Sequence, residues 1–393
     1  MSFKNSNHKY FDLTMNKILL LIFGVWPYRQ SHLIRFQFIC LSSILATNII
    51  FQCTVFASHK CTLDLVIKVL SSVFPFVFCI TKYNLFSFKI KAMKDMFEQL
   101  FHACNKLKNA NEIAIIDEYR YIAKRYTILL TTLITFVVLS FILLPFLPDI
   151  FNIILRTNFT RSQHVLIVEY FINQEKYFYL ILLHYIASFC IAMISMVAIG
   201  TIMLTYLQFT CGMFKIASYR LECAMSINML QNVNFRKNIL ICKGLICAID
   251  IHRQAMKLST LFQSNCEIMF FFLIIFGVLT ISFNLFRIAS SKENLHEISI
   301  SFINTTIFFV YMFLSNYFAQ IVMDHNHQVF VTAYNIRWYL TPVCVQKIIL
   351  FLLQRSMKTF SVNIGRIYNA SIEGFATLAK ASISYFTVIY STR

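Results

Sequence analysis

Long apolar stretches alternate with short charged segments along most of the chain. Each stretch has at least the roughly 20 residues that a helix needs to cross about 30 Å of hydrocarbon. The pattern predicts an all-α membrane protein with seven transmembrane helices. The predicted spans are residues 33–57, 63–87, 126–148, 178–204, 266–289, 298–323 and 364–390. A shorter apolar run at 18–25 has no cleavage site after it and is predicted to stay as a cytoplasmic or interfacial segment.

The last predicted span carries a polar stripe. At about 100° per residue, one sector of this helix collects polar side chains and one valine, while the opposite side is apolar. Polar groups inside a bilayer normally face a bundle interior or a water-filled path, so the stripe indicates a conduction route. The alternative is a packed helix in which Glu373 pairs internally with Lys380. The stripe is Arg366, Glu373, Thr377, Lys380, Ser384, Val388 and Ser391, and the apolar side is Phe375, Leu378, Ile383, Phe386 and Ile389.

Composition agrees with a membrane protein, since 58% of the residues are hydrophobic, 13% are charged, and 42 are Phe. The net charge of +18 would indicate nucleic-acid binding in a soluble protein, but here its distribution matters more. The segments 1–32, 88–125, 205–265 and 324–363 hold 23 Lys and Arg, whereas 58–62, 149–177 and 290–297 hold 5. The positive-inside rule therefore predicts a cytoplasmic N-terminus and, after seven crossings, an extracellular C-terminus.

Three Asn-X-Ser/Thr sequons bear on this orientation. Asn158 lies in the longest predicted outer loop and is the predicted glycosylation site. The sequons at Asn304 and Asn369 fall inside predicted spans, where the glycosylation machinery would not reach them.

No catalytic or metal-binding motif is evident, so neither an enzyme nor a cofactor is predicted. Of 12 Cys, only Cys61 lies in a predicted outer loop, and the others are expected to be buried hydrophobes or reduced thiols. His325 and His327 are two residues apart and would point away from each other on a helix. The run 324–327 is therefore predicted to be a solvated turn at the membrane edge and not a metal site. Gly-rich phosphate loops, His-Glu-x-x-His and nucleophile-elbow patterns are not found.

Ordered motifs occur ahead of the first span and after residue 323. They are Gly24-Val25-Trp26-Pro27, Trp338-Tyr339-Leu340-Thr341-Pro342, Gln346-Lys347-Ile348-Ile349-Leu350, Gln354-Arg355-Ser356 and Ser382-Ile383-Ser384-Tyr385-Phe386-Thr387-Val388. In these motifs, and in length, span number and orientation, the chain resembles the insect odorant receptor family. The resemblance implies a tuning subunit of an odorant-gated, non-selective cation channel. Such a subunit assembles with a shared coreceptor into a heterotetramer in the plasma membrane of olfactory sensory neurons.

The resemblance also implies a division of the chain. Residues 1–323 would hold the N-terminal segment, the first six helices and the odorant pocket, 324–363 a cytoplasmic anchor region with a helix at about 338–358, and 364–393 the pore helix. The gate would lie at Val388, with Thr392 one turn outward. Lys380 departs from the pattern, because it would place a positive charge near a cation path. The residues expected to hold subunits together are Trp338, Tyr339, Gln346, Ile349, Leu352 and Leu353.

A volatile odorant is small and mostly apolar, so its pocket should be largely aromatic with one or two polar groups. The outer halves of the second, third, fourth and sixth spans supply such residues, although ordinary helix packing would explain any one of them. The predicted ligand-binding residues are Phe74, Phe78, Phe141, Tyr179, His184, Tyr185, Phe309 and Tyr311.

Three other classes compete with this interpretation. A seven-helix receptor coupled to G proteins is opposed by the inverted orientation, and a secondary transporter should show inverted repeats. A gustatory receptor-type channel is opposed by the C-terminal residues Tyr390-Ser391-Thr392-Arg393, because that family carries a Tyr-containing motif ending in Gln-Phe.

Overall fold

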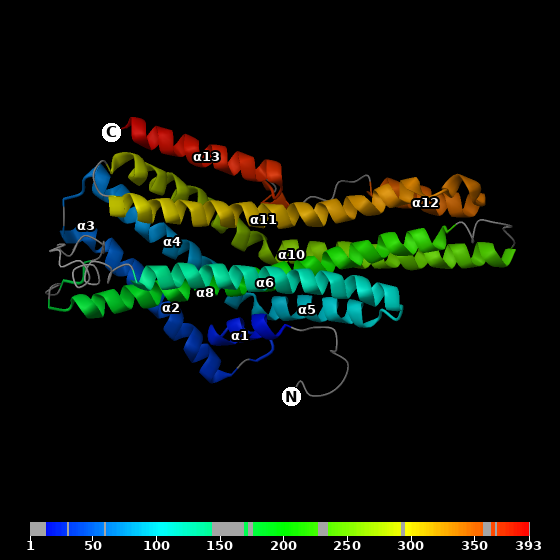
Figure 1. The fold of residues 1–393 in the computed structure, drawn as a ribbon, viewed down its shortest axis with the longest axis horizontal. Coiled ribbons are helices and arrows are strands. Elements are labelled where there is room, and N and C mark those ends of the chain that lie inside the picture. The colour runs from blue at the N-terminus through cyan, green and yellow to red at the C-terminus, as the bar shows by residue number, and fades with distance from the viewer. Residues whose placement is uncertain are drawn as a thin grey trace, which may run out of the picture.

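The computed structural model describes residues 13–29, 31–58, 60–143, 169–171, 176–226, 235–291, 295–356, 363–365 and 368–392. Over these residues the chain forms α-helices and one small antiparallel hairpin (Figure 1). The elements are α1 (Thr14–Ile22), α2 (His32–Cys53), α3 (Val55–Ser58), α4 (Leu63–Phe88), α5 (Ile90–Asn105), α6 (Ala110–Leu143), α8 (Phe178–Ala224), α10 (Phe235–Ser290), α11 (Leu295–Asn335), the 3₁₀ turn η3 (Trp338–Leu340), α12 (Val343–Ser356), β1 (Asn363–Ile364), β2 (Tyr368–Asn369) and α13 (Ile372–Ser391).

Six helical stretches in the described part of the chain are long and apolar enough to cross a membrane. They match the first six predicted spans, so the prediction of an all-α membrane protein is confirmed. The seventh predicted span corresponds to α13, which has 20 residues, includes Glu373 and Lys380, and is not among these six stretches. The six stretches are His32–Ser58, Leu63–Phe88, Ala110–Leu143, Phe178–Ala224, Arg236–Ser290 and Glu297–Asn335.

Several helices run far beyond the predicted spans. α6, α8, α10 and α11 have 34, 47, 56 and 41 residues, whereas about 20 suffice to cross a bilayer. Much of the sequence in the inner segments between the predicted spans, at 88–125, 205–265 and 324–363, is therefore helical. Charged side chains end an apolar stretch, but they do not end a helix when they lie on its exposed face.

The long helices lie side by side in an elongated bundle, with α3 near one end and α12 near the other (Figure 1). α8 packs against α4, α6, α10 and α11 and is buried over most of its length. A helix that is apolar on all sides belongs inside a bundle. Tyr206, Phe209 and Phe214 of α8 are each at most 1% exposed and form part of the main core.

The last helix begins later than predicted. Asn363–Ile364 and Tyr368–Asn369 form the β1–β2 hairpin, and α13 starts only at Ile372. The side chain of Ser371 accepts a hydrogen bond from the Gly374 N–H at 3.0 Å and caps this helix. Asn369 therefore lies in strand β2 and not inside a spanning helix. Arg366 lies outside the described residues.

Two further local predictions are wrong. The run 324–327 is not a turn, because it lies inside α11, where His325 bonds to Tyr119 at 2.6 Å and Asn326 to His252 at 3.0 Å. The predicted helix at 338–358 is broken, because the 3₁₀ turn η3 ends before Pro342, and α12 starts only at Val343. Proline lacks an N–H and fits only the first turn of a helix, which accounts for the break.

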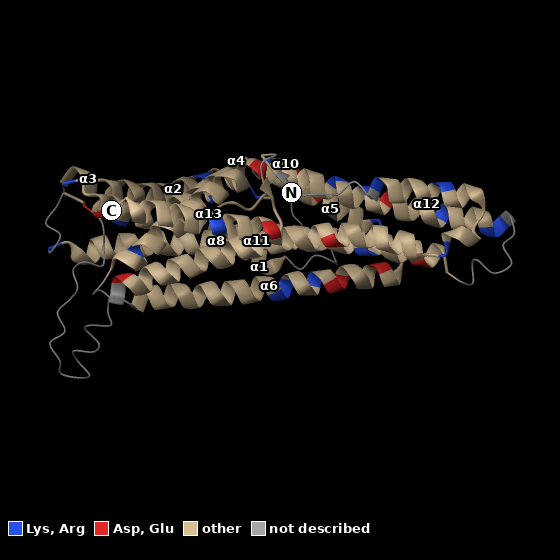
Figure 2. Cartoon of the chain, turned by 90° about the horizontal axis from the view of Figure 1, so that it is seen from above, with Lys and Arg blue, Asp and Glu red and all other residues tan. Residues whose placement is uncertain are grey.

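Charged residues are distributed unevenly along the bundle. Figure 2 shows long tan stretches around α2 and α13, whereas blue and red residues gather toward α5, α12 and the neighbouring part of α10. The half of the bundle at the α12 end thus has the charge content of a solvated surface. The half at the α3 end has the low charge content of a segment within lipid.

Candidate functional site

A cavity of about 350 Å³ lies near the α3 end of the bundle, where α6 and α10 finish and α8 and α11 begin. Four helices supply nearly all of its wall, and α10 adds one arginine. We call it the four-helix cavity. It is lined by Ser72, Pro75, Phe76 and Cys79 of α4, Phe136, Val137, Ser140 and Phe141 of α6, Tyr185, Phe189, Ala192 and Met193 of α8, Arg287 of α10, and Glu297, Ile300, Ile303, Asn304 and Ile307 of α11.

Aromatic rings form much of one wall of this cavity. Phe141 stacks on Phe189 with ring centroids 3.8 Å apart and also contacts Tyr185 at 5.8 Å. Phe76 meets Tyr185 edge to face at 5.8 Å. These pairs fix the rings against each other and present flat apolar surfaces to the cavity. Of the predicted ligand-binding residues, Phe141 and Tyr185 line it.

The other predicted ligand-binding residues lie elsewhere. Phe74 packs against Phe276 and Phe283 of α10, and Phe309 faces Phe375 of α13. Tyr179 is 61% exposed at the start of α8. His184 bonds to Tyr170 at 2.6 Å and to Thr47 at 3.1 Å, so both its ring nitrogens have interhelical or loop partners.

Phe78 and Tyr311 belong to an aromatic cluster that also contains Phe308. Phe78 is fully buried and meets Phe308 and Tyr311 edge to face, at 5.0 and 5.3 Å. The Lys82 ammonium lies 4.8 Å from the centre of the Tyr311 ring and donates to the Met196 carbonyl at 2.9 Å. Lys82 is only 1% exposed, so the ring and the carbonyl replace water around its charge.

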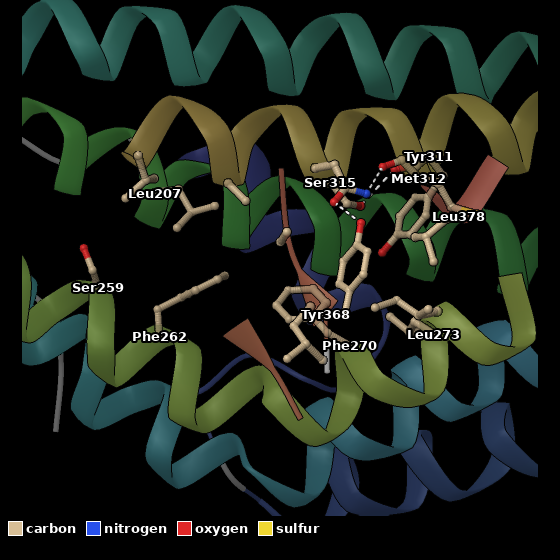
Figure 3. Close-up of a pocket in the computed structure, with 16 residues that line it drawn as sticks. Leu207, Ser259, Phe262, Phe270, Leu273, Tyr311, Met312, Ser315, Tyr368 and Leu378 are labelled. Atoms are coloured by element: carbon tan, nitrogen blue, oxygen red, sulfur yellow. Dashed lines mark hydrogen bonds between the residues drawn. The ribbon is translucent and has the colours of Figure 1, made fainter. Parts of the chain in front are cut away.

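Tyr311 also lines a narrow cavity of about 70 Å³ beside the hairpin, which we call the hairpin cavity (Figure 3). Tyr368 of strand β2 points across it and donates a hydrogen bond to Asn316 of α11. Leu378 of α13 closes one side. The hairpin is thus bonded to α11 at the level where α13 begins.

α13 leaves its polar stripe uncovered in a single chain. Glu373, Thr377, Lys380, Ser384, Val388, Ser391 and Thr392 are all exposed, with Val388 at 57%. On the other side Leu378 and Ser382 are buried, and Ser282 of α10 donates to the Ser382 carbonyl at 2.9 Å. Ile383 departs from the predicted apolar side, because it is 50% exposed. Among the described residues, Glu373 forms no ion pair with Lys380, so the pairing alternative has no support.

The segment from η3 to α12 divides its apolar residues between two faces. Ile349 and Leu352 are 1% and 5% exposed and pack inside their own chain, and Leu353 is partly buried. Trp338 is partly buried, and the Gln346 side chain donates to the Thr341 carbonyl at 2.7 Å. The exposed apolar residues are Tyr339, Leu340, Val343, Leu350 and Phe351.

Two features of the site were missed by the sequence analysis. One is the group of Arg287, Glu297 and Lys68 at the four-helix cavity, and the other is the buried Lys82. Lys68, Lys82 and Arg287 each lie inside a predicted span, and a charge in such a position is itself a signal of function. Asn158 lies outside the described residues.

Of the cysteines, Cys104 in α5 is an inert core residue, because burial raises the pKa of its thiol to about 12.

Comparisons with known proteins agree with this architecture. A family profile described as 7tm Odorant receptor matches residues 62–383. The fold is similar to solved structures of the insect olfactory receptor OR5 from Machilis hrabei, alone and in complex with eugenol. For each, the TM-score is 0.76 at 14% identity, over 97% of this chain and 98% of that one. No curated protein matches the sequence.

Proposed function

The chain belongs to the 7tm odorant receptor family, and from this premise we propose that it is the odorant-binding subunit of a ligand-gated, non-selective cation channel. The observation that carries the proposal is the pairing of a mostly apolar four-helix cavity with a last helix whose polar face is uncovered. The first feature suits a small volatile ligand. The second suits a pore wall.

The four-helix cavity is the proposed ligand site. Its volume of about 350 Å³ is at the small end of the range for small-molecule pockets. Apart from Arg287 of α10, its wall comes from the helices of the same four predicted spans that were expected to supply the pocket. The OR5 structure with eugenol, a small aromatic molecule, shows that a receptor of this fold binds a compound of this size class.

α13 is the proposed pore helix. When copies of the subunit or of a coreceptor surround a central axis, the face bearing Thr377, Ser384 and Val388 would line the path, because the opposite face is packed on α10 and α11. Lys380 lies on the same face, and a coreceptor without this charge would limit its effect on cations.

α11 is the proposed mechanical link between ligand and pore. It lines the four-helix cavity with Asn304 and Ile307 and the hairpin cavity with Tyr311. On the same helix, Phe309 and Phe313 contact Phe375 of α13, with ring centroids 6.4 and 5.4 Å apart. A displacement of α11 by a bound ligand would therefore be transmitted to the pore helix through direct ring contacts.

The exposed apolar face of η3 and α12 is the proposed subunit anchor. We further propose that the N-terminus and the α12 end lie in the cytoplasm, as the distribution of basic residues predicts. The working channel would be a heterotetramer with a coreceptor in the plasma membrane of olfactory sensory neurons.

Recordings from excised patches test the proposed function. Cells expressing the chain with a coreceptor should show unitary cation currents when volatiles are applied without nucleotide. A receptor coupled to G proteins would lose its response on excision, and a transporter would give no unitary steps. Coreceptor alone is the control. Patches that contain the chain at the surface but never open with any volatile would overturn the proposal.

A further inference from the structure

A charged group borders the four-helix cavity. Lys68 of α4 and Glu297 of α11 form an ion pair of 2.6 Å, and Arg287 of α10 approaches the other carboxylate oxygen of Glu297 at 3.7 Å. Arg287 also donates through Nη1 to Ser71 of α4 at 3.2 Å. The group therefore contains two cations and one anion.

Arg287 is the least satisfied member of this group. Its side chain is only 11% exposed and forms part of the cavity wall. Its Nε–H is buried and has no hydrogen-bond partner among the described residues. The 3.7 Å separation from Glu297 is too long for a hydrogen bond, whereas Lys68 holds the same carboxylate at bonding distance. Glu297 thus bonds to Lys68 and only approaches Arg287, and these three side chains together carry a net positive charge.

A buried guanidinium with an unpaired N–H is stabilised when an anionic oxygen binds to it. Arginine binds carboxylates through short charge-assisted hydrogen bonds, which are stronger than those between neutral groups. Carboxylic acids are ionised at neutral pH, as a Glu side chain with its pKa of about 4.3 is. Most of the rest of the wall, including Phe136, Phe141, Ile303 and Ile307, is apolar and suits a short hydrocarbon tail.

We propose that this receptor is tuned to small carboxylic acids, with the carboxylate on Arg287 and the hydrocarbon tail among the aromatic and aliphatic residues of the four-helix cavity. This inference rests on the proposed function, since it assumes that the cavity is the ligand site. The site distinguishes an acid from the matching alcohol or ester because only the acid neutralises the buried cation. A site that holds an unpaired polar group discriminates strongly against ligands that leave it unpaired.

The test compares hexanoic acid with 1-hexanol and methyl hexanoate on cells that express the chain with a coreceptor. The acid is expected to open the channel at a concentration at least tenfold lower than either neutral compound. Arg287→Met should weaken the response to the acid roughly tenfold to hundredfold, the range for loss of a charged hydrogen bond, and leave the alcohol response nearly unchanged. Arg287→Lys keeps the charge but not the planar donor group. Its sensitivity to the acid should therefore lie between that of the unmodified receptor and that of Arg287→Met.

Arg253→Met is the matched control, because Arg253 lies on the same helix, is 82% exposed and is far in sequence from the cavity wall. It should preserve the acid preference. Equal sensitivity to acid and alcohol in the unmodified receptor, or an acid preference that survives Arg287→Met, would overturn the inference while the channel function stands. If neither acid nor neutral volatiles open channels that reach the surface, the proposed function fails together with it. If Arg287→Met does not reach the surface, the unmodified receptor and Arg287→Lys still decide the question.

Discussion

At the scale of single residues, Gly374 shows how closely the hairpin packs on the last helix. A Cβ at this position would lie 2.2 Å from the Asn369 carbonyl oxygen and 2.8 Å from the Tyr368 hydroxyl. We predict that Gly374→Ala destabilises the protein by about 1–3 kcal/mol, the usual cost of overpacking. Thermal unfolding of the detergent-solubilised receptor measures this loss.

Gly200→Ala is the matched control for that change. The nearest atom to its added Cβ would be the Lys82 ammonium at 3.6 Å, an ordinary contact. Alanine also favours the helix, so this variant should be at least as stable as the parent. If both variants unfold at the same temperature as the unmodified protein, the hairpin does not pack on α13 as described.

Glu112 of α6 and Arg220 of α8 form a bidentate ion pair, and Arg220 also bonds to a third helix, α10. Arg220 donates to both carboxylate oxygens, at 2.7 and 2.9 Å, and to the Cys247 carbonyl of α10 at 3.0 Å. Arg220→Met would leave the Glu112 carboxylate, 7% exposed, without this partner. We predict that this change lowers the free energy of unfolding by about 2–4 kcal/mol. This value is toward the lower part of the range for buried pairs, because Arg220 is 24% exposed.

The exposed pair of Lys94 with Glu98 is the comparison for this prediction, since its side chains are 44% and 53% exposed. Lys94→Met should change the stability by less than about 0.5 kcal/mol. Denaturant unfolding of both variants makes the measurement. An Arg220→Met receptor as stable as Lys94→Met would show that the buried pair does not hold α6, α8 and α10 together.

At the scale of elements, the two faces of α12 have different roles. Phe351 is 70% exposed, whereas Ile349 of the same helix is 1% exposed. We predict that Phe351→Ala weakens co-purification with the coreceptor without lowering the amount of folded chain, because large apolar anchors dominate interface energy. Ile349→Ala should instead lower stability by about 2–4 kcal/mol. Unchanged co-purification of a folded Phe351→Ala chain would exclude this face as the anchor.

The elements also show what the sequence could and could not predict. Spans such as 63–87 and 178–204 were predicted because a long apolar run is a local property. The sequence does not predict that α8 continues to Ala224 or that α10 already starts at Phe235. These parts carry charges on exposed faces and are held by packing between distant segments.

The same limit applied to the sites. Phe141 and Tyr185 line a cavity in the region where the sequence predicts the pocket. Phe74 of α4 and Tyr179 of α8 also belong to helices that line this cavity, but their side chains point elsewhere. Helical spacing defines a face of one helix. It does not define which neighbour covers that face, and for the same reason Leu352 could not be distinguished from the exposed Phe351.

At the scale of the whole molecule, the basic residues predict an orientation in the membrane. An epitope at the N-terminus should be labelled only in permeabilised cells, and Asn158 should be the only glycosylated sequon, since Asn369 lies in the hairpin on the proposed cytoplasmic side. Antibody access to the epitope on intact cells would contradict the orientation. A glycosidase-sensitive band that survives Asn158→Gln would contradict the assignment of the glycan.

The assembled pore gives the last prediction. Val388 is 57% exposed on the polar face of α13, and an apolar constriction stops ions by dewetting, because the wall offers no replacement for water. We predict that Val388→Ser or Val388→Asn raises basal current or shifts ion selectivity. The same changes at the partly buried Ile389 should mainly reduce surface yield. Ser384→Lys, one turn below, should lower cation conductance by adding positive charge, with a partial effect if coreceptor subunits form most of the ring. Unaltered conductance, selectivity and basal opening at Val388 and Ser384, in surface channels that contain this chain, would show that α13 does not line the pore.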